Sequence, residues 1–164
     1  MRLCAVSVDL DEIPNYFHIH GLGVPADAAT AVYDRALGRL SDLSDALHIP
    51  LTLFAIASDL NRAESATRLR AASDRGHEVA NHSLNHFYDL SRRPRLEMER
   101  QVVVAADKIE VVTGQRPVGF RARQRLDHAS ALHFVVILVN DPMFRRDVAV
   151  GQKTGKRLRD GVTE

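Results

Sequence analysis

The chain of 164 residues is poor in several features that would assign it to a common class of protein. Its single cysteine, Cys4, cannot form a disulfide within the chain, and its place in a short apolar run predicts a core residue. No apolar run approaches the roughly 18 residues of a membrane span. Asp9 follows so soon after the first residue that the chain as written has no secretory leader. These absences predict a soluble, cytoplasmic protein.

An excess of charge of one sign is also missing. The 22 lysines and arginines balance 21 aspartates and glutamates, for a formal net charge of +1. A charge this small does not favour nucleic acid or an anionic membrane as a partner. Hydrophobic residues make up 45% of the chain and charged residues 26%, which is typical of one globular domain with a buried core.

Apolar segments of two kinds alternate along the chain. Short runs rich in β-branched residues predict buried strands, whereas apolar residues at helical spacing predict amphipathic helices. This alternation is typical of an α/β fold with a parallel sheet and outer helices. A segment with two prolines and two glycines, residues 13–25, predicts a long loop. The predicted strands are residues 3–8, 51–57, 77–80 and 134–139, and the predicted helices are residues 26–47, 63–75 and 94–113.

The chemically most distinctive segment is residues 76–86, in which His82 and His86 stand four residues apart. On one turn of helix, residues at this spacing share a face with Cβ atoms about 5 to 6 Å apart, so both imidazoles could reach one divalent ion. Taken alone, such a pair is more typical of a solvated helix face. An oxygen ligand nearby is needed before the pair indicates a metal site.

Asp9 and Asp11 are candidate carboxylate ligands at the end of the first predicted strand. Alternation along an extended chain puts both on the same side, and the carboxyl ends of strands are where sites lie in α/β folds. Both acids also fit simple turn formation, but the end of a buried strand favours a cation near them. In the loop that follows, Tyr16, His18 and His20 are weaker candidates for substrate contact.

Three segments occur in an order that resembles the polysaccharide deacetylases of carbohydrate esterase family 4, which carry the NodB-type domain. Residues 7–11 match the first motif in a form with one residue between the aspartates, and residues 76–86 match the second motif at every defining position. Phe120 and Arg121 match the start of the third. The resemblance implies a deacetylase-like domain over residues 1–123, on an incomplete or distorted (β/α) barrel. The segment 124–164 is divergent, and we expect its tail to be disordered.

The resemblance also implies a metal-dependent hydrolase. Asp11, His82 and His86 would bind a divalent ion, either Zn²⁺ or another such as Co²⁺ or Ni²⁺. Asp9 would act as the catalytic base that takes a proton from the attacking water. The implied reaction is removal of an N- or O-acetyl group from a carbohydrate.

Other residues of the matched motifs are expected to support these groups. Arg121 would hold the Asp9 carboxylate by a charge-assisted hydrogen bond, as a second catalytic residue. Asn81 and Ser83 would orient the histidine turn. His77 would pack or form hydrogen bonds beneath the site.

The match breaks down after Arg121, where residues 123–125 stand in place of an expected proline and its neighbour. The family's late Leu-His motif supplies the acid for the leaving amine. Its one echo, Leu132-His133, lies only 12 residues after Arg121, too close for the strands and helices that should intervene. We therefore hypothesise a truncated or frame-disrupted chain whose activity is in question.

Two alternatives to a carbohydrate deacetylase stay open. One is a hydrolase of another non-peptide C–N bond, in a ureide or a small amide, because members of this superfamily also hydrolyse such bonds. The other is a catalytically impaired remnant that binds metal or glycan. The expected partner is thus a carbohydrate or small amide substrate, and the sequence leaves the oligomeric state open.

Overall fold

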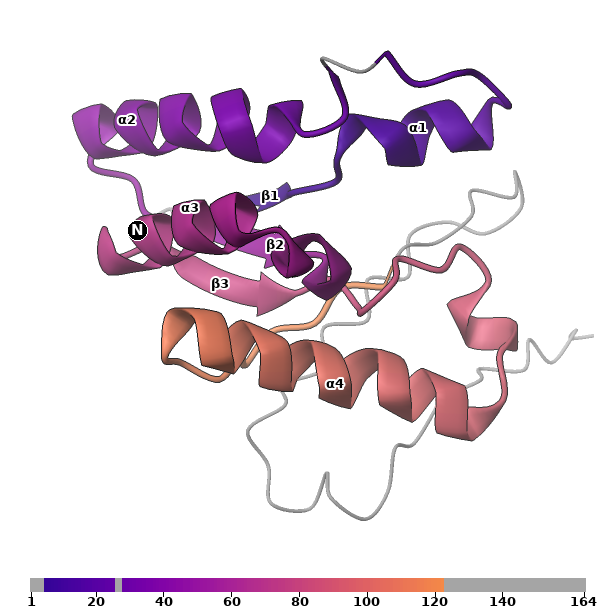
Figure 1. Cartoon of the computed structure of the whole chain (residues 1–164). Helices are drawn as coiled ribbons and strands as arrows, with labels where there is room; N and C mark the ends of the chain where they lie inside the picture. Colours follow the sequence, from indigo (N-terminus) through magenta and orange to yellow (C-terminus); the bar gives the residue numbers. More distant parts are fainter. Residues whose placement is uncertain (1–4, 26–27, 123–164) are drawn as a thin grey trace, which may run out of the picture.

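The computed structural model describes residues 5–25 and 28–122 (Figure 1). Several of the sequence predictions lie outside these residues. They are the core position of Cys4, the departure from the third motif at 123–125, the strand at 134–139, the echo at His133 and the disordered tail.

A three-stranded parallel sheet forms the centre of the described structure. Its strands are β1 (Val6–Asp9), β2 (Leu51–Ala55) and β3 (Glu78–Asn81), in the order β1-β2-β3. The predicted parallel sheet with outer helices is therefore confirmed, with strand ends shifted by at most three residues. The chain returns to the sheet once more, where Phe120 forms a parallel bridge with Asn81.

Helices connect these strands and cover the sheet (Figure 1). They are α2 (Leu37–Leu47), α3 (Ala63–Asp74) and α4 (Arg95–Thr113), and α4 ends at Gly114 in the left-handed conformation that glycine favours. A 3-10 helix, η3 (Ala57–Asn61), follows β2 directly. The main core lies between sheet and helices, and each of its fully buried leucines contributes about 1.5 to 3 kcal/mol. Core residues include Leu37, Leu53, Ala55, Leu69 and Ile109.

The predicted loop at 13–25 is wrong in part, because it contains helix α1 (Ile13–Ile19). Pro14 lies in the first turn of this helix, where proline needs no hydrogen-bond partner and its fixed φ suits the helix. The helix is short and ends before Gly21, whose φ is +63°. A proline that indicates a loop when read along the sequence therefore begins a helix here.

The predicted helix over 26–47 has its regular α-helical part only from Leu37 onward, in α2. A π-helical segment, η2 (Val32–Ala36), precedes it. Its first N–H groups, those of Val32 and Tyr33, donate to the two carboxylate oxygens of Glu12 at 3.0 Å each. The carboxylate of Glu12, 20 residues upstream, thus provides acceptors for N–H groups that have no partner at the start of a helix. The periodicity of apolar residues does not predict this interaction.

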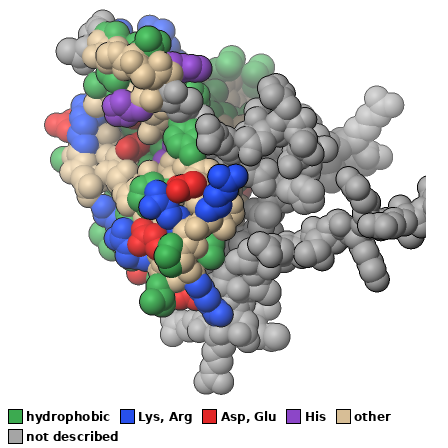
Figure 2. All heavy atoms as spheres, turned by 90° about the vertical axis from the view of Figure 1, so that its right-hand side faces the viewer, with side chains coloured by type: hydrophobic (Ala, Val, Ile, Leu, Met, Phe, Trp, Pro, Cys, Tyr) green, Lys and Arg blue, Asp and Glu red, His purple; other side chains and the backbone are tan. Residues whose placement is uncertain are grey.

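Ion pairs cover much of the surface near α4 and the 3-10 helix η4 (Leu90–Arg92) that precedes it. On the face shown in Figure 2, basic and acidic side chains lie interspersed. The pairs near the start of α4 join Arg93 to Asp89, Arg95 to Glu99 and Arg100 to Glu97. Of the described helices, not one combines the length and the apolar composition that crossing a membrane requires.

Candidate metal centre

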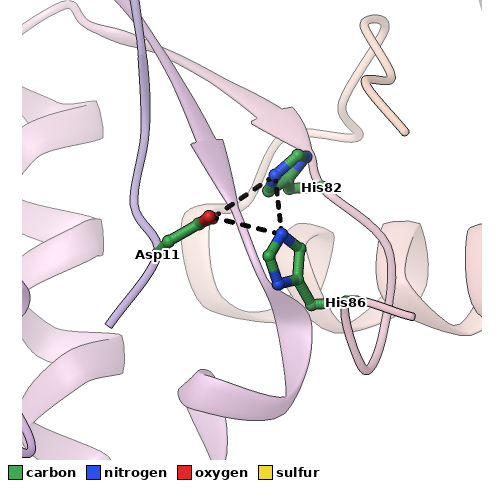
Figure 3. Close-up of side chains that lie close together, drawn as sticks. All are labelled: Asp11, His82 and His86. Atoms are coloured by element: carbon green, nitrogen blue, oxygen red, sulfur yellow. Dashed lines mark hydrogen bonds and ion pairs between the residues drawn. The ribbon is translucent and has the colours of Figure 1, made fainter. Parts of the chain in front are cut away.

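Three predicted ligands meet at the carboxyl edge of the sheet (Figure 3). Asp11 follows β1, His82 directly follows β3, and His86 lies four residues further on. The Nε2 atom of His82 is 3.3 Å from Asp11 Oδ1, and that of His86 is 3.3 Å from Asp11 Oδ2. The two Nε2 atoms are 3.2 Å apart. All three side chains are buried, and they form a group that could hold one metal ion.

These separations agree with the size of a divalent ion. Bonds of about 2.0 to 2.2 Å at tetrahedral angles place neighbouring ligand atoms roughly 3.3 to 3.6 Å apart. Two imidazoles and one carboxylate also form a donor set that suits zinc and similar ions. The chemistry of the donor set therefore fits a divalent ion, with a different oxygen of Asp11 facing each histidine.

The orientation of His82 is set by the chain near the third motif. Its Nδ1 lies 2.7 Å from the main-chain carbonyl of Arg121. A carbonyl only accepts, so Nδ1 carries the proton in this bond and donates it. The lone pair of Nε2 is then directed toward Asp11 and His86, as a metal ligand requires.

The histidine segment is not the helical turn that its spacing predicts. Residues after Asn81 form an irregular loop in which Ser83 and His86 have positive φ values of 69° and 56°. Side chains replace the missing helical hydrogen bonds, because Ser83 N donates to Asn81 Oδ1 and His86 N donates to Ser83 Oγ. The two imidazoles therefore converge without the helical geometry from which their pairing was argued, and the expected supporting role of Asn81 and Ser83 agrees with these bonds.

Gln101 of α4 is a supporting residue that the sequence reasoning missed. Its side chain is fully buried, and its Oε1 accepts a hydrogen bond from the main-chain N–H of Asn85 at 2.8 Å. Its Nε2 donates to Glu97 on the same helix. The sequence could have indicated it, because this glutamine lies on the buried face of a helix, four residues before the buried Ala105.

The other two predicted site residues form an ion pair beside the metal group. Arg121 Nη1 donates to Asp9 Oδ1 at 2.5 Å, and Nη2 donates to Ser7 Oγ at 2.7 Å. The guanidinium also lies over the ring of Phe54, 3.9 Å from its centroid. Asp9 Oδ2 is 3.9 Å from His82 Nε2, and the Asp9 side chain keeps 34% of its exposure. Asp9 thus borders the group from the solvent side, whereas Asp11 lies inside it.

Two further acids, Asp59 and Glu12, interact electrostatically with each other and with Asp11, and were not predicted. Burial raises the pKa of Asp59 to about 7, and the nearby carboxylates of Glu12 and Asp11 add to this rise. Burial likewise raises the pKa of Tyr33, with Asp59 as the next contribution. Asp59 follows β2 in η3, and no motif in the sequence pointed to it.

The remaining histidines lie apart from the three ligands. His77 is buried just before β3, at the opposite end of that strand from His82, and burial lowers its pKa. It therefore does not lie beneath the site as expected. His18 and His20 are exposed at the end of α1. Tyr16, the third loop candidate, does approach the group, because its hydroxyl donates to Asp11 Oδ2.

Comparison with known proteins identifies the family. The family description of polysaccharide deacetylases matches residues 27–132. A search of curated proteins finds no match. Among solved structures, the peptidoglycan deacetylase PdaC from Bacillus subtilis is 23% identical with a TM-score of 0.52, over 72% of this chain and 47% of that chain. Puue allantoinase is 20% identical with a TM-score of 0.57, over 71% and 44%.

A third structure, the peptidoglycan N-acetylglucosamine deacetylase Bc1960, is 15% identical with a TM-score of 0.54, over 76% of this chain and 48% of that chain. The chain thus spans less than half the length of these proteins. At such identities the likeness shows a shared fold, and it confirms the predicted α/β architecture of the NodB type. Since the family description covers well over half of the residues, the chain belongs to the polysaccharide deacetylase family.

Proposed function

We propose that this protein is a metal-dependent hydrolase that removes N- or O-acetyl groups from a carbohydrate. The observation that carries the proposal is the meeting of a buried Asp11, His82 and His86 with the Asp9 and Arg121 ion pair at one edge of the sheet. Zinc is the proposed ion, with Co²⁺ or Ni²⁺ as substitutes, because the donor set is two imidazoles and one carboxylate.

The metal and the protein have separate tasks in this proposal. A divalent ion held by these three residues would polarise the acetyl carbonyl and lower the pKa of bound water toward 7. The two histidines and Asp11 fix where this happens, below the partly exposed Asp9. His82 is held in the required tautomer by the carbonyl of Arg121.

Asp9 is the proposed general base. Its carboxylate is not one of the three ligands, yet Oδ2 lies 3.9 Å from His82 Nε2, so it can reach a water beside the metal group. The guanidinium of Arg121 is fixed by Ser7 and by the ring of Phe54, and it holds the other carboxylate oxygen. A base oriented in this way needs little rearrangement to accept a proton.

The substrate class rests first on the family, and the names of the distant structural relatives support both the carbohydrate and its alternative. PdaC and Bc1960 are named as deacetylases of peptidoglycan, which supports a carbohydrate, whereas Puue is named as an allantoinase. The likeness to Puue supports the ureide alternative to the same degree, because the same metal chemistry would hydrolyse a cyclic amide. We also keep the domain boundary near residue 123 as a proposal.

The test is hydrolysis by protein of known metal content. Chelated protein is reloaded with Zn²⁺, Co²⁺ or Ni²⁺, its bound metal is quantified, and acetate release is measured from N-acetylglucosamine oligomers and from acetate esters. Small ureides are assayed in parallel. We expect one ion per chain, acetate release with metal, and loss of turnover in Asp9→Asn.

Each other result would change the proposal. Ring opening of a ureide without acetate release would replace the substrate class. One bound ion without turnover on any substrate would favour the impaired remnant. Full activity of Asp9→Asn or His82→Ala would remove the roles assigned to those residues.

A further inference from the structure

Two tyrosines connect helix α1 to the metal group. Tyr16 lies on α1, and Tyr88 follows the histidine loop more than 70 residues later. The hydroxyl of Tyr16 donates to Asp11, and the hydroxyl of Tyr88 donates to the main-chain carbonyl of Asn15 at 3.1 Å. Each tyrosine thus joins α1 to the part of the chain that carries a ligand.

The contact of Tyr16 is made with a single carboxylate oxygen. Its hydroxyl lies 3.4 Å from Asp11 Oδ2, the same oxygen that is 3.3 Å from His86 Nε2. A donor on one oxygen limits rotation of the carboxylate about its Cβ–Cγ bond, so that the other oxygen keeps facing His82. The distance exceeds the roughly 2.8 Å of an ordinary hydroxyl bond, as is common in sites that tighten when their ligand binds.

Tyr88 contacts both the same helix and the ligand His86. Its ring packs edge-on against His86, with ring centroids 5.5 Å apart and planes at 62°. Its hydroxyl meanwhile holds Asn15, the residue before Tyr16. A seven-residue helix gains little stability from its own hydrogen bonds, so contacts of this kind decide where it lies.

We propose that Tyr16 is a positioning residue that orients the Asp11 carboxylate for metal binding, and that Tyr88 holds α1 in the place from which Tyr16 acts. The proposal rests on the metal group of the proposed function but not on its reaction. Groups that orient a metal ligand typically change metal affinity by about 10- to 100-fold. Because the Tyr16 contact is long, we expect the lower end of that range.

The chain offers a matched set of variants for the test. Its three tyrosines are Tyr16, Tyr88 and Tyr33, and it has no tryptophan, so tyrosine emission can be followed alone. Each is changed to phenylalanine, which removes the hydroxyl and keeps the ring. Tyr33→Phe is the control, because its buried hydroxyl makes no hydrogen bond within the described residues. Zn²⁺ affinity of the full chain is measured by competition with a chelating dye.

We expect about tenfold weaker Zn²⁺ binding in Tyr16→Phe, a smaller loss in Tyr88→Phe and an unchanged dissociation constant in Tyr33→Phe. The change of tyrosine emission on adding Zn²⁺ should be smaller in Tyr16→Phe, in which Tyr88 beside His86 still reports, and should keep its full size in the control. An affinity of Tyr16→Phe within twofold of the wild type would overturn the inference while leaving the metal group intact. Failure of the wild-type chain to bind Zn²⁺ would remove both. A wild-type chain that binds Zn²⁺ but releases no acetate would contradict the proposed reaction and leave the inference about Tyr16 unchanged.

Discussion

The main-chain carbonyl of Arg121 accepts a hydrogen bond from Nδ1 of His82 over 2.7 Å. The side chain of the same arginine donates to Asp9. This is possible because the chain pairs again with β3, where Arg121 N donates to the carbonyl of Asn81. One residue therefore orients a proposed metal ligand through its backbone and the proposed base through its side chain.

Replacing the Arg121 side chain should separate these two effects. In Arg121→Gln the carbonyl that holds His82 remains, whereas the charge that holds Asp9 is lost. We expect kcat to fall roughly 10- to 100-fold, part of what a positioned base contributes, with Zn²⁺ affinity changed less than threefold. The measurement is steady-state acetate release together with metal titration.

The control for this variant is Arg116→Gln, which removes a surface arginine paired with Asp107 and Glu110. Surface pairs of this kind contribute little, so its kcat should match the wild type. Equal losses of kcat and of metal affinity in Arg121→Gln would show that the arginine supports the whole site and has no separate effect on Asp9.

Removal of one imidazole should abolish tight metal binding. His82→Ala leaves two of three ligands, so we expect bound zinc to fall from one ion per chain to a small fraction, as measured by elemental analysis after dialysis. The control is His48→Asn, at an exposed histidine with a φ of 54°, a conformation that asparagine tolerates. Retention of a full equivalent of zinc in His82→Ala would contradict the proposed ligand set.

The stability of the metal-free protein should depend on Asp59. Its pKa rises from the ordinary 3.8 to about 7 in the folded state, chiefly through burial. A raised pKa means that the folded state favours the protonated form, so this contribution is complete below about pH 4 and is lost as the pH rises through 7. Asp59→Asn mimics the protonated form at every pH.

We therefore expect Asp59→Asn to match the wild type near pH 4 and to be more stable at pH 8, by roughly 1 to 3 kcal/mol given the incomplete burial of the site. Urea unfolding in the presence of a chelator, at several values of pH, measures the difference. A stability difference that stays constant from pH 4 to pH 8 would show that Asp59 titrates normally.

The stability contributed by the histidine loop should depend on the hydroxyl of Ser83. Ser83 Oγ accepts the buried N–H of His86, so Ser83→Ala leaves that donor without its bond and should lower the free energy of unfolding by about 1 to 3 kcal/mol. Chemical denaturation measures the loss. Ser91→Ala, at an exposed position of η4, should stay within about 0.5 kcal/mol of the wild type. Equal stability of both variants would mean that the loop is held by its other bonds.

The helices that follow β2 and β3 agree with the predictions from the spacing of apolar residues. The same spacing does not predict which residues of these helices are buried. Leu96 and Val111 of α4 are 80% and 84% exposed, although they are apolar, and Gln101 is fully buried. Periodicity gives the existence of a helix, but the exact phase of its buried face depends on what packs against it. In α4, that face includes the contact of Gln101 with the histidine loop.

The sequence alone determined the types and the spacing of the proposed ligands, and the alternation of strands and helices that brings strand ends to one edge. It could do so because side-chain direction repeats with a local period in both kinds of element. Only the tertiary structure decided the rest: that the histidines lie on a loop, that Glu12 satisfies a distant helix start, and that Tyr16 reaches Asp11. These features depend on hydrogen bonds between residues far apart in the chain, which form only once packing has placed them together.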